Sequence, residues 1–262
     1  MPSPEEKAHE LVCAFVGDAD IVWSAAGGDG AIDIVNVLDF AQIGKPLNKL
    51  YIGFSDSCSI CYALATQCDM PSIYGHNVKG MADIKEDRLD VLDMIAGKKC
   101  FSTYDWWENV KTGIVKPPIE AYHYSAPIKG RMIGGLVENM VAICGTTADQ
   151  TSAFIDRHPD AILFLEAYKL SPANLQVHLN KLEQAGWLEK MSGFVVARSY
   201  NYYNPTKMAQ ANEVWKQYLL KFGKPVFLNV DISHMYPTIP IFYNKSAKIS
   251  FDSGRLFFEY QR

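Results

Sequence analysis

Apolar residues alternate between extended runs and helical spacing along the whole chain. Residues 20–25 and 49–54 form apolar runs typical of buried strands, and apolar residues at helical spacing lie between them at 32–40. A third short strand is predicted at 71–76. Because parallel strands separated by helices build layered sheets, residues 1–77 are predicted to form an N-terminal three-layer α/β domain of the Rossmann or flavodoxin type.

The rest of the chain follows a different order. Residues 78–130 are predicted to be a connecting segment, and residues 131–262 a C-terminal mixed α/β domain. Strands are predicted at 162–166, 193–197 and 225–230, with a closing hairpin at 247–259. Helices are predicted from Pro4 onward, at 82–96, at 171–184 with Ser171 as N-cap, and at 206–222.

Composition excludes several classes of protein. The chain has 262 residues, 48% of them hydrophobic and 21% charged, which is ordinary for a globular protein. A net charge of −4 argues against a nucleic-acid partner. No apolar run approaches the roughly 18 to 20 residues of a membrane helix, and acids stand where a signal peptide has bases. We therefore expect a cytoplasmic protein with no membrane partner.

The cysteines and histidines do not indicate a metal or cofactor. The six cysteines lie mostly inside apolar segments, as reduced and packed thiols do. Cys58 and Cys61 form a C-x-x-C whose thiols could have lowered pKa values near a helix N-terminus, but a second C-x-x-C and a redox-type aromatic flank are missing. The histidines are scattered, without H-E-x-x-H.

The stretch from Lys49 to Cys61 carries the first candidate for chemistry. Its apolar run breaks at Ser55 and continues at helical spacing, which predicts a strand, a tight turn and a helix with the serine at the turn. The N–H that follows Ser55 would then face a developing oxyanion. The usual elbow reads G-x-S-x-G, and Ser57 replaces the last glycine here, so a plain serine N-cap is the alternative.

Two further groups complete a candidate triad. Glu166 ends the apolar strand at 162–166, and His234 follows the strand at 225–230. A histidine that accepts the Ser55 proton and an acid that orients the imidazole are what an activated serine requires. Alternatively, each is an ordinary polar residue at a strand end.

A glycine cluster, Gly27-Gly28-Asp29-Gly30, lies between the first strand and its helix. Its spacing matches neither G-x-G-x-x-G nor a P-loop. Backbone N–H groups there could approach a substrate carbonyl; a plain tight turn and a glycine-loop nucleotide binder are the alternatives.

Together these segments resemble the LD-carboxypeptidase family of serine peptidases, which includes murein tetrapeptide carboxypeptidases and microcin C self-immunity proteins. The similarity extends from about Pro4 to about Phe251. The motifs that carry it are Gly27-Gly28-Asp29-Gly30, Ile52-Gly53-Phe54-Ser55-Asp56, Arg131-Met132-Ile133-Gly134-Gly135, Cys144-Gly145-Thr146, Leu163-Phe164-Leu165-Glu166 and Ser233-His234.

The resemblance implies a serine hydrolase with its active site between the two domains. Ser55 would be the nucleophile, His234 the base and Glu166 its orienting acid, with the N–H groups of Asp56 and of Gly28 or its neighbour Gly27 binding the oxyanion. It also implies no cofactor and a homodimer. Weaker candidates for substrate binding are Gly27, Asp29, His76, Trp106 and Arg131.

The resemblance leaves the substrate open. An LD-carboxypeptidase would release a C-terminal D-amino acid from a murein tetrapeptide, whereas an immunity-type hydrolase would cleave a peptidyl nucleotide. The loop from Ala26 to Gly30 is closer to the Gly-Gly-Asp-Asp form of the immunity branch than to Arg-Gly-Gly-Tyr-Gly. Ser233 replaces a family glycine. Family members usually have about two more strand–helix units before the segment that begins at Pro4, so the first domain is expected either to be shortened or to lack an N-terminal piece in this sequence. A catalytically inactive ligand-binding relative is the third possibility.

Three smaller expectations remain. A substrate carboxylate needs a nearby cation, for which Lys129, Arg131 and Arg198 are candidates. His76 is a weaker base than His234, with a structural or cleft-edge role expected. Trp106 and its neighbour Trp107 are expected either to stack on a nucleobase or sugar, or to form core or dimer contacts.

Overall fold

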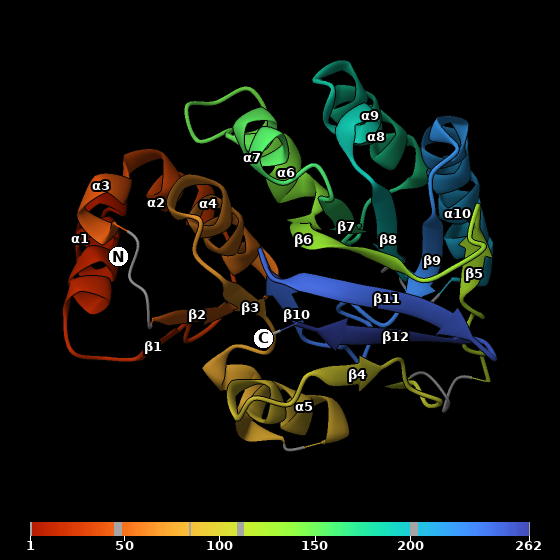
Figure 1. The fold of residues 1–262 in the computed structure, drawn as a ribbon, viewed down its shortest axis with the longest axis horizontal. Helices are drawn as coiled ribbons and strands as arrows, with labels where there is room; N and C mark the ends of the chain where they lie inside the picture. Colours follow the sequence, from red (N-terminus) through yellow and green to blue (C-terminus); the bar gives the residue numbers. More distant parts are fainter. Residues whose placement is uncertain (1, 45–48, 84, 109–112, 200–203, 262) are drawn as a thin grey trace.

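A single mixed, mostly parallel β-sheet extends through the computed structural model, which describes residues 2–44, 49–83, 85–108, 113–199 and 204–261. The three N-terminal strands are parallel to one another, and so are the four strands at 128–136, 162–166, 193–197 and 226–230. The strands at 241–243 and 120–122 pair antiparallel with the strands at 72–74 and 226–230. Figure 1 shows the sheet crossing the molecule. Its strand order is β1 (Ile21–Trp23), β2 (Leu50–Gly53), β3 (Ser72–Tyr74), β10 (Ile241–Tyr243), β6 (Ile128–Leu136), β7 (Ile162–Glu166), β8 (Gly193–Ala197), β9 (Val226–Val230) and β5 (Glu120–Tyr122).

Helices cover both faces of the N-terminal strands. Four lie on one face, and α5 (Glu86–Ile95) lies on the other (Figure 1). The first begins at Pro4 as predicted, because Ser3 accepts the Glu6 N–H while the Glu6 side chain accepts the Ser3 N–H. The helices on the first face are α1 (Pro4–Val16), α2 (Ala31–Val37), α3 (Phe40–Ile43) and α4 (Cys58–Cys68).

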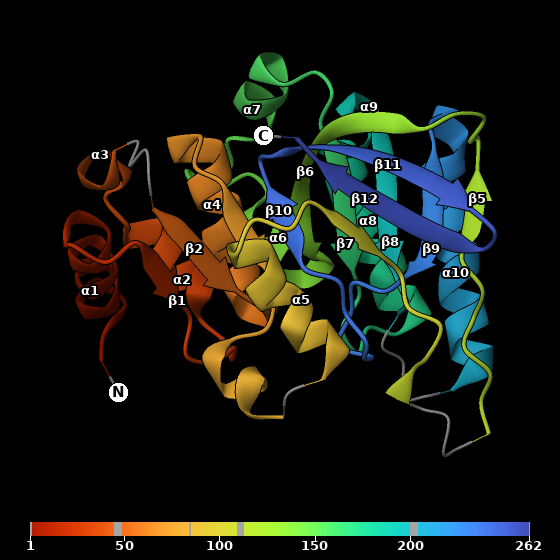
Figure 2. The same ribbon diagram turned by 60° about the horizontal axis from the view of Figure 1, so that its bottom comes forward.

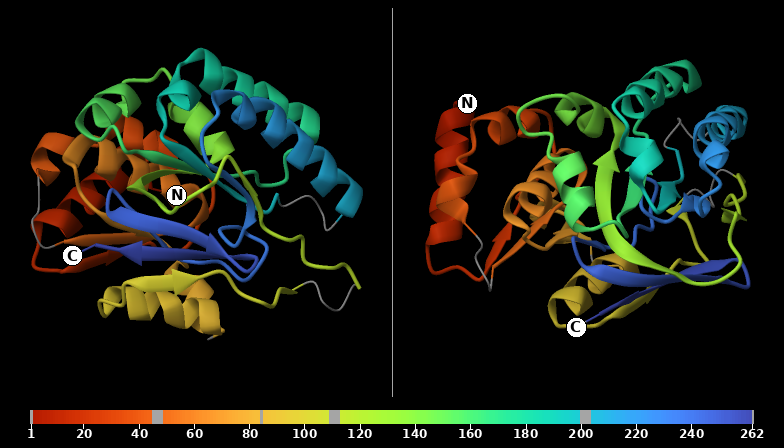
Figure 3. Two further views of the ribbon diagram at one scale, coloured as in Figure 1. Left: turned by 45° about the vertical axis from the view of Figure 1, so that its right-hand side comes forward. Right: turned by 45° about the horizontal axis from the view of Figure 1, so that its top comes forward.

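The C-terminal strands are covered by helices on one side and by an antiparallel layer on the other (Figure 2). In the left view of Figure 3, β11 and β12 lie beside β4 below the main sheet. The long strand β6 belongs to both layers, because its first residues pair with β11 and its last residues with β7. The helices are α6 (Val137–Ile143), α7 (Thr151–Arg157), α8 (Pro172–Gln184), α9 (Trp187–Lys190) and α10 (Pro205–Leu219), and the strands are β11 (Ser246–Asp252), β12 (Arg255–Tyr260) and β4 (Cys100–Ser102).

Several predicted elements are confirmed. Ser171 accepts the Asn174 N–H at the start of α8, as predicted, and this helix buries Leu175, Leu179 and Leu182. Strand β8 has the predicted bounds, and the closing hairpin turns between Asp252 and Arg255. None of the helices among the described residues is long and apolar enough to cross a membrane.

Other predictions need correction. The strand at 20–25 is a half-exposed edge strand, because β1 pairs only with β2 among the described strands. The predicted helix at 82–96 is α5 preceded by a short 3-10 turn at Val78–Ala82. The predicted division between residues 130 and 131 stays a prediction; both residues lie in β6, and the predicted connecting segment 78–130 contains strands and a helix.

The C-x-x-C lies inside the core. Cys58 and Cys61 are fully buried on α4, and all the cysteines are free. Burial raises the pKa of Cys58, and it raises the pKa of Cys61 to about 12. A redox role would need thiols with lowered pKa values, and these two have raised ones. The pair therefore contributes to core packing.

Candidate active site

Ser55 occupies a sharp turn at the carboxyl end of β2. Its φ of +63° lies in the left-handed region, which non-glycine residues rarely adopt, and a 3-10 turn at Ser55–Ser57 then leads into α4. The Asn77 side chain holds the preceding residue, because Oδ1 accepts the Phe54 N–H at 2.9 Å and Nδ2 donates to the Phe54 carbonyl at 3.2 Å. The chain therefore forms the predicted strand–turn–helix with the serine at its turn.

The three candidate triad residues form one chain of hydrogen bonds. Ser55 Oγ lies 2.9 Å from His234 Nε2, and His234 Nδ1 lies 2.7 Å from Glu166 Oε1. The His234 backbone N–H also donates to Glu166 Oε1 at 2.5 Å. With Nδ1–H donating to Glu166, Nε2 is left to accept the Ser55 proton.

Glu166 ends β7 and is fully buried. A buried carboxylate needs several donors, and its second oxygen accepts the Tyr74 hydroxyl at 3.0 Å. The His234 ring lies against Phe54 and Tyr168, with ring centroids 4.7 and 4.4 Å away. These contacts fix the acid and the imidazole in place.

The glycine loop lies directly against the nucleophile. A Cβ on Gly27 would be 3.0 Å from Ser55 Cβ and 3.3 Å from Ser55 Oγ, so a larger residue there would push the loop or the serine aside by a few tenths of an ångström. Gly28 has a φ of +145°, which L-residues rarely adopt. The Asp56 carboxylate accepts the Ala31 N–H and the Asn139 amide, each at 2.8 Å, which fixes the backbone next to Ser55. Burial raises the Asp56 pKa.

A cavity of about 370 Å³ opens in front of Ser55. Of the described residues that line it, Lys79 carries a positive charge and none is acidic. Its lining consists of Ala26, Gly27, Phe54, Ser55, His76, Asn77, Lys79, Gly80, His234 and Tyr236. A larger cavity of about 510 Å³ lies among α5, β4 and the last hairpin and contains no triad residue, so the chemistry assigns the site to the smaller one.

His76 lines this cavity but does not contact the nucleophile. It is 1% exposed, and its Nε2 lies 3.1 Å from Asp87, which also pairs with Arg88. Burial lowers the His76 pKa, so the neutral imidazole is favoured at the edge of the cavity.

Several predicted site residues lie elsewhere. Arg131 is five positions before Leu136, which pairs with Glu166, so it lies toward the amino end of β6, where its guanidinium donates to the Asn244 carbonyl. Lys129 lies further along the same end. The Trp106 indole donates to Glu86 at 2.9 Å and does not line the cavity.

The other predicted cation and the remaining loop residue do not line the cavity either. Arg198 is fully buried and pairs with Asp231. Asp29 is exposed on the glycine loop. Trp107 is buried in a small cluster with Met208 and Met235, which is the core role weighed for it from the sequence.

Sequence reasoning missed several residues at this site. Tyr74 is the last residue of β3, and Asn77 and Lys79 follow that strand. Tyr168 follows β7. Because carboxyl ends of parallel strands meet at one edge, listing every polar residue at those ends would have found them.

Glu138 is a further missed residue close to the triad. Its Oε1 accepts the Tyr168 N–H at 3.1 Å, and its buried Oε2 has no hydrogen-bond partner among the described residues. Burial raises the Glu138 pKa to about 7. Among the described ranges, no group of three or more histidines, cysteines or acids is placed to hold a metal ion.

Two domains of known proteins match most of the chain. Residues 1–75 match the LD-carboxypeptidase N-terminal domain, and residues 129–249 match the LD-carboxypeptidase C-terminal domain. A probable murein peptide carboxypeptidase of Bacillus subtilis is 25% identical over 241 residues, which are 90% of this chain and 71% of that protein.

Two solved structures share the fold. Muramoyltetrapeptide carboxypeptidase from Oxalobacter formigenes gives a TM-score of 0.77 at 19% identity, covering 100% of this chain and 86% of that one. A MccF-like protein from Streptococcus pneumoniae in complex with AMP gives 0.78 at 20% identity, covering 99% and 84%. The two matched domains, in family order and around one candidate triad, establish that this chain belongs to the LD-carboxypeptidase family.

Proposed function

We propose that the protein is a serine hydrolase that cleaves an amide bond with a Ser55–His234–Glu166 triad. The observation that carries this proposal is the unbroken chain of hydrogen bonds of 2.9 and 2.7 Å from the serine to the buried acid. The left-handed turn at Ser55 supports it, because that backbone exposes the hydroxyl to the cavity.

The reaction proceeds by acyl transfer. Ser55 Oγ attacks the substrate carbonyl while His234 Nε2 takes its proton, and Glu166 stabilises the imidazolium that forms. The N–H groups of Asp56 and Gly28 stabilise the oxyanion, each contributing on the order of 3 kcal/mol to transition-state stabilisation. His234 then protonates the leaving amine, and water, activated by the same histidine, hydrolyses the acyl enzyme.

The preferred substrate is a murein tetrapeptide that loses its C-terminal D-amino acid. The similarity to the probable murein peptide carboxypeptidase of Bacillus subtilis supports this choice. The charge of the cavity supports it too, because Lys79 supplies a cation for the terminal carboxylate and no acid among the described lining residues opposes it.

The nucleotide relatives favour a second candidate, hydrolysis of a peptidyl or aminoacyl nucleotide. The Streptococcus pneumoniae protein is in complex with AMP. In the present chain, Tyr236 and Phe54 line the cavity and offer aromatic rings to a base. An inactive ligand-binding protein is disfavoured by the intact hydrogen-bonded triad.

Parallel turnover assays distinguish these substrates. The protein is incubated with a D-alanine-terminated murein tetrapeptide and with aspartyl sulfamoyl adenosine, and product release is followed by mass spectrometry. We expect release of D-alanine by the wild-type protein and by the matched control Ser57→Ala, and no release by Ser55→Ala. Ser57 serves as the control because its hydroxyl bonds Ser24 and not the triad. Turnover of the nucleotide alone would overturn the murein assignment, and turnover that survives Ser55→Ala would overturn the proposed triad.

A further inference from the structure

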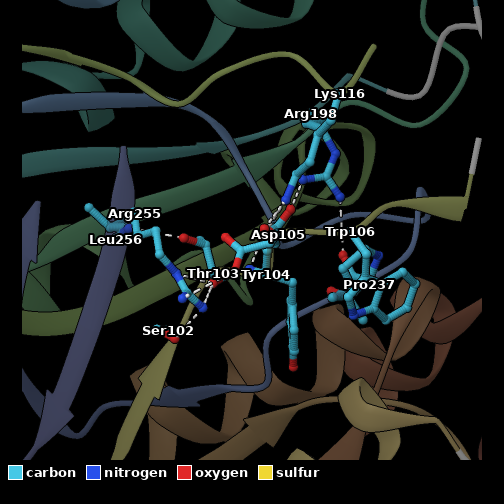
Figure 4. Close-up of polar contacts among 12 residues, drawn as sticks. Ser102, Thr103, Tyr104, Asp105, Trp106, Lys116, Arg198, Pro237, Arg255 and Leu256 are labelled. Atoms are coloured by element: carbon cyan, nitrogen blue, oxygen red, sulfur yellow. Dashed lines mark hydrogen bonds and ion pairs between the residues drawn. The ribbon is translucent and has the colours of Figure 1, made fainter. Parts of the chain in front are cut away.

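His234 stands on an irregular loop between β9 and β10, which has to be held by side-chain contacts. Arg198, the first residue after β8, lies behind this loop and is fully buried. Its Nη2 donates to the Met235 carbonyl at 2.7 Å and to the Pro237 carbonyl at 3.1 Å. Its Nη1 pairs with the Asp231 carboxylate at the start of the loop. Figure 4 shows Arg198 with its hydrogen bond toward Pro237.

Asp231 is in turn anchored by the segment before β5. Its Oδ2 accepts the Tyr104 N–H at 2.8 Å and the Lys116 ammonium at 3.0 Å (Figure 4). The Asp231 carbonyl accepts the Ile239 N–H at 2.6 Å, which draws the two ends of the loop together. The Arg198 guanidinium therefore links the residues that follow His234 to the Asp231 carboxylate that precedes it. Tyr104 and Lys116 in turn hold that carboxylate in place.

Burial of a charge is costly unless partners compensate it, and here every described hydrogen bond and ion pair of the guanidinium goes to this loop. Its other described contact is the Trp107 ring, whose centroid lies 5.9 Å away. We propose that Arg198 is a positioning residue for His234, holding the imidazole within reach of Ser55 through Met235, Pro237 and Asp231. This inference rests on the proposed function, since it assigns Arg198 to the same triad.

Replacing Arg198 with methionine fills similar space but leaves two carbonyls and one carboxylate oxygen without their donor. The loop is then free to shift, and a displacement of about 1 Å at a catalytic group costs on the order of a hundredfold in rate. Lysine keeps the charge but lacks the planar fork that reaches the carbonyls and Asp231 together, so Arg198→Lys should restore only part of the rate.

Arg255 provides a matched control. It donates to the Thr103 carbonyl and to Ser102, and it lies 3.4 Å from Asp105, on the other side of the strand segment that leads to Tyr104 (Figure 4). Arg255→Met therefore removes a nearby arginine. The described contacts of Arg255 do not include the His234 loop.

The test measures the rate at which a fluorophosphonate labels Ser55, corrected for the folded fraction from urea denaturation. Arg198→Met, Arg198→Lys and Arg255→Met are each prepared with His234 and with His234→Ala. With His234 present, we expect a ten- to hundredfold loss for Arg198→Met, an intermediate loss for Arg198→Lys and less than a twofold change for Arg255→Met. In the His234→Ala background, Arg198→Met should change the rate less than twofold, because its effect acts through the imidazole.

Equal losses for Arg198→Met and Arg255→Met, or the same loss with and without His234, would overturn the positioning role and leave the triad intact. If Arg198→Met does not fold, Arg198→Lys carries the same comparison. A wild-type protein that is never labelled at Ser55 would overturn the proposed function itself, and this inference with it.

Discussion

Gly27→Ala tests whether the glycine loop and Ser55 form one site. The added Cβ would lie 3.0 Å from Ser55 Cβ, 3.3 Å from Ser55 Oγ and 3.5 Å from the Asn77 amide nitrogen. Carbon atoms in contact prefer about 3.5 to 4.0 Å, so the loop and the serine must separate by a few tenths of an ångström. Ser55 has little freedom to move, because its backbone is left-handed and Asn77 clamps Phe54.

The displacement therefore falls on the loop and on any oxyanion donor that it carries. Since a misplacement of about 1 Å costs on the order of a hundredfold, a shift of a few tenths of an ångström should cost about three- to tenfold, or about 0.7 to 1.4 kcal/mol of transition-state stabilisation. The free energy of unfolding should change little, since Gly27 is exposed. Alanine also lowers the conformational entropy of the unfolded chain, which stabilises the folded state by roughly 0.4 to 1 kcal/mol and offsets part of the contact penalty.

Gly17→Ala is the control for this variant. Its added Cβ would meet the Cys13 carbonyl at the same 3.0 Å, at the exposed end of α1. Fluorophosphonate labelling and urea denaturation are measured for both variants. A labelling rate for Gly27→Ala within twofold of wild type, or an equal loss in Gly17→Ala, would refute the assignment of the loop to the site.

Three further predictions concern charge and hydrogen bonding. Tyr74→Phe should lower the free energy of unfolding by about 1 to 3 kcal/mol, because buried Glu166 loses a donor; an unchanged urea midpoint would contradict this. The pKa of Glu138 is about 7 in the folded protein and near 4.5 in the unfolded chain. The free energy of unfolding therefore falls as the pH rises from about 4.5 to about 7, and it stays at the lower value above that range. Glu138→Gln should therefore stabilise the protein about 2 kcal/mol more at pH 8 than at pH 5, and equal gains in urea denaturation would refute the assignment. Lys79→Gln should reduce the preference for a peptide with a free carboxylate over its amide about tenfold or more in kcat/KM, whereas Lys129→Gln should leave it unchanged.

The sequence predicted much of this arrangement because its signals are local. Ser55, Glu166 and His234 each stand directly at or shortly after the end of an apolar run, and parallel strands bring such ends together at one edge. Ser171 and Pro172 likewise specify the start of α8 without any distant contact.

Features that depend on distant pairing were not predictable in the same way. Strand β10 has three residues and no useful periodicity, yet it enters the sheet antiparallel to β3 and parallel to β6. The sequence predicts Arg131 as a candidate for carboxylate binding, because it does not reveal the length and direction of β6, which carry this residue away from the catalytic edge. The partners of Arg198 come from three separate parts of the chain.

Peptide mapping after reaction with a fluorophosphonate tests the triad most directly. We predict one adduct, on the peptide that contains Ser55, which is absent in Ser55→Ala, present in Ser57→Ala and formed much more slowly in His234→Ala. An unmodified Ser55, or an adduct that forms equally fast without His234, would contradict the account.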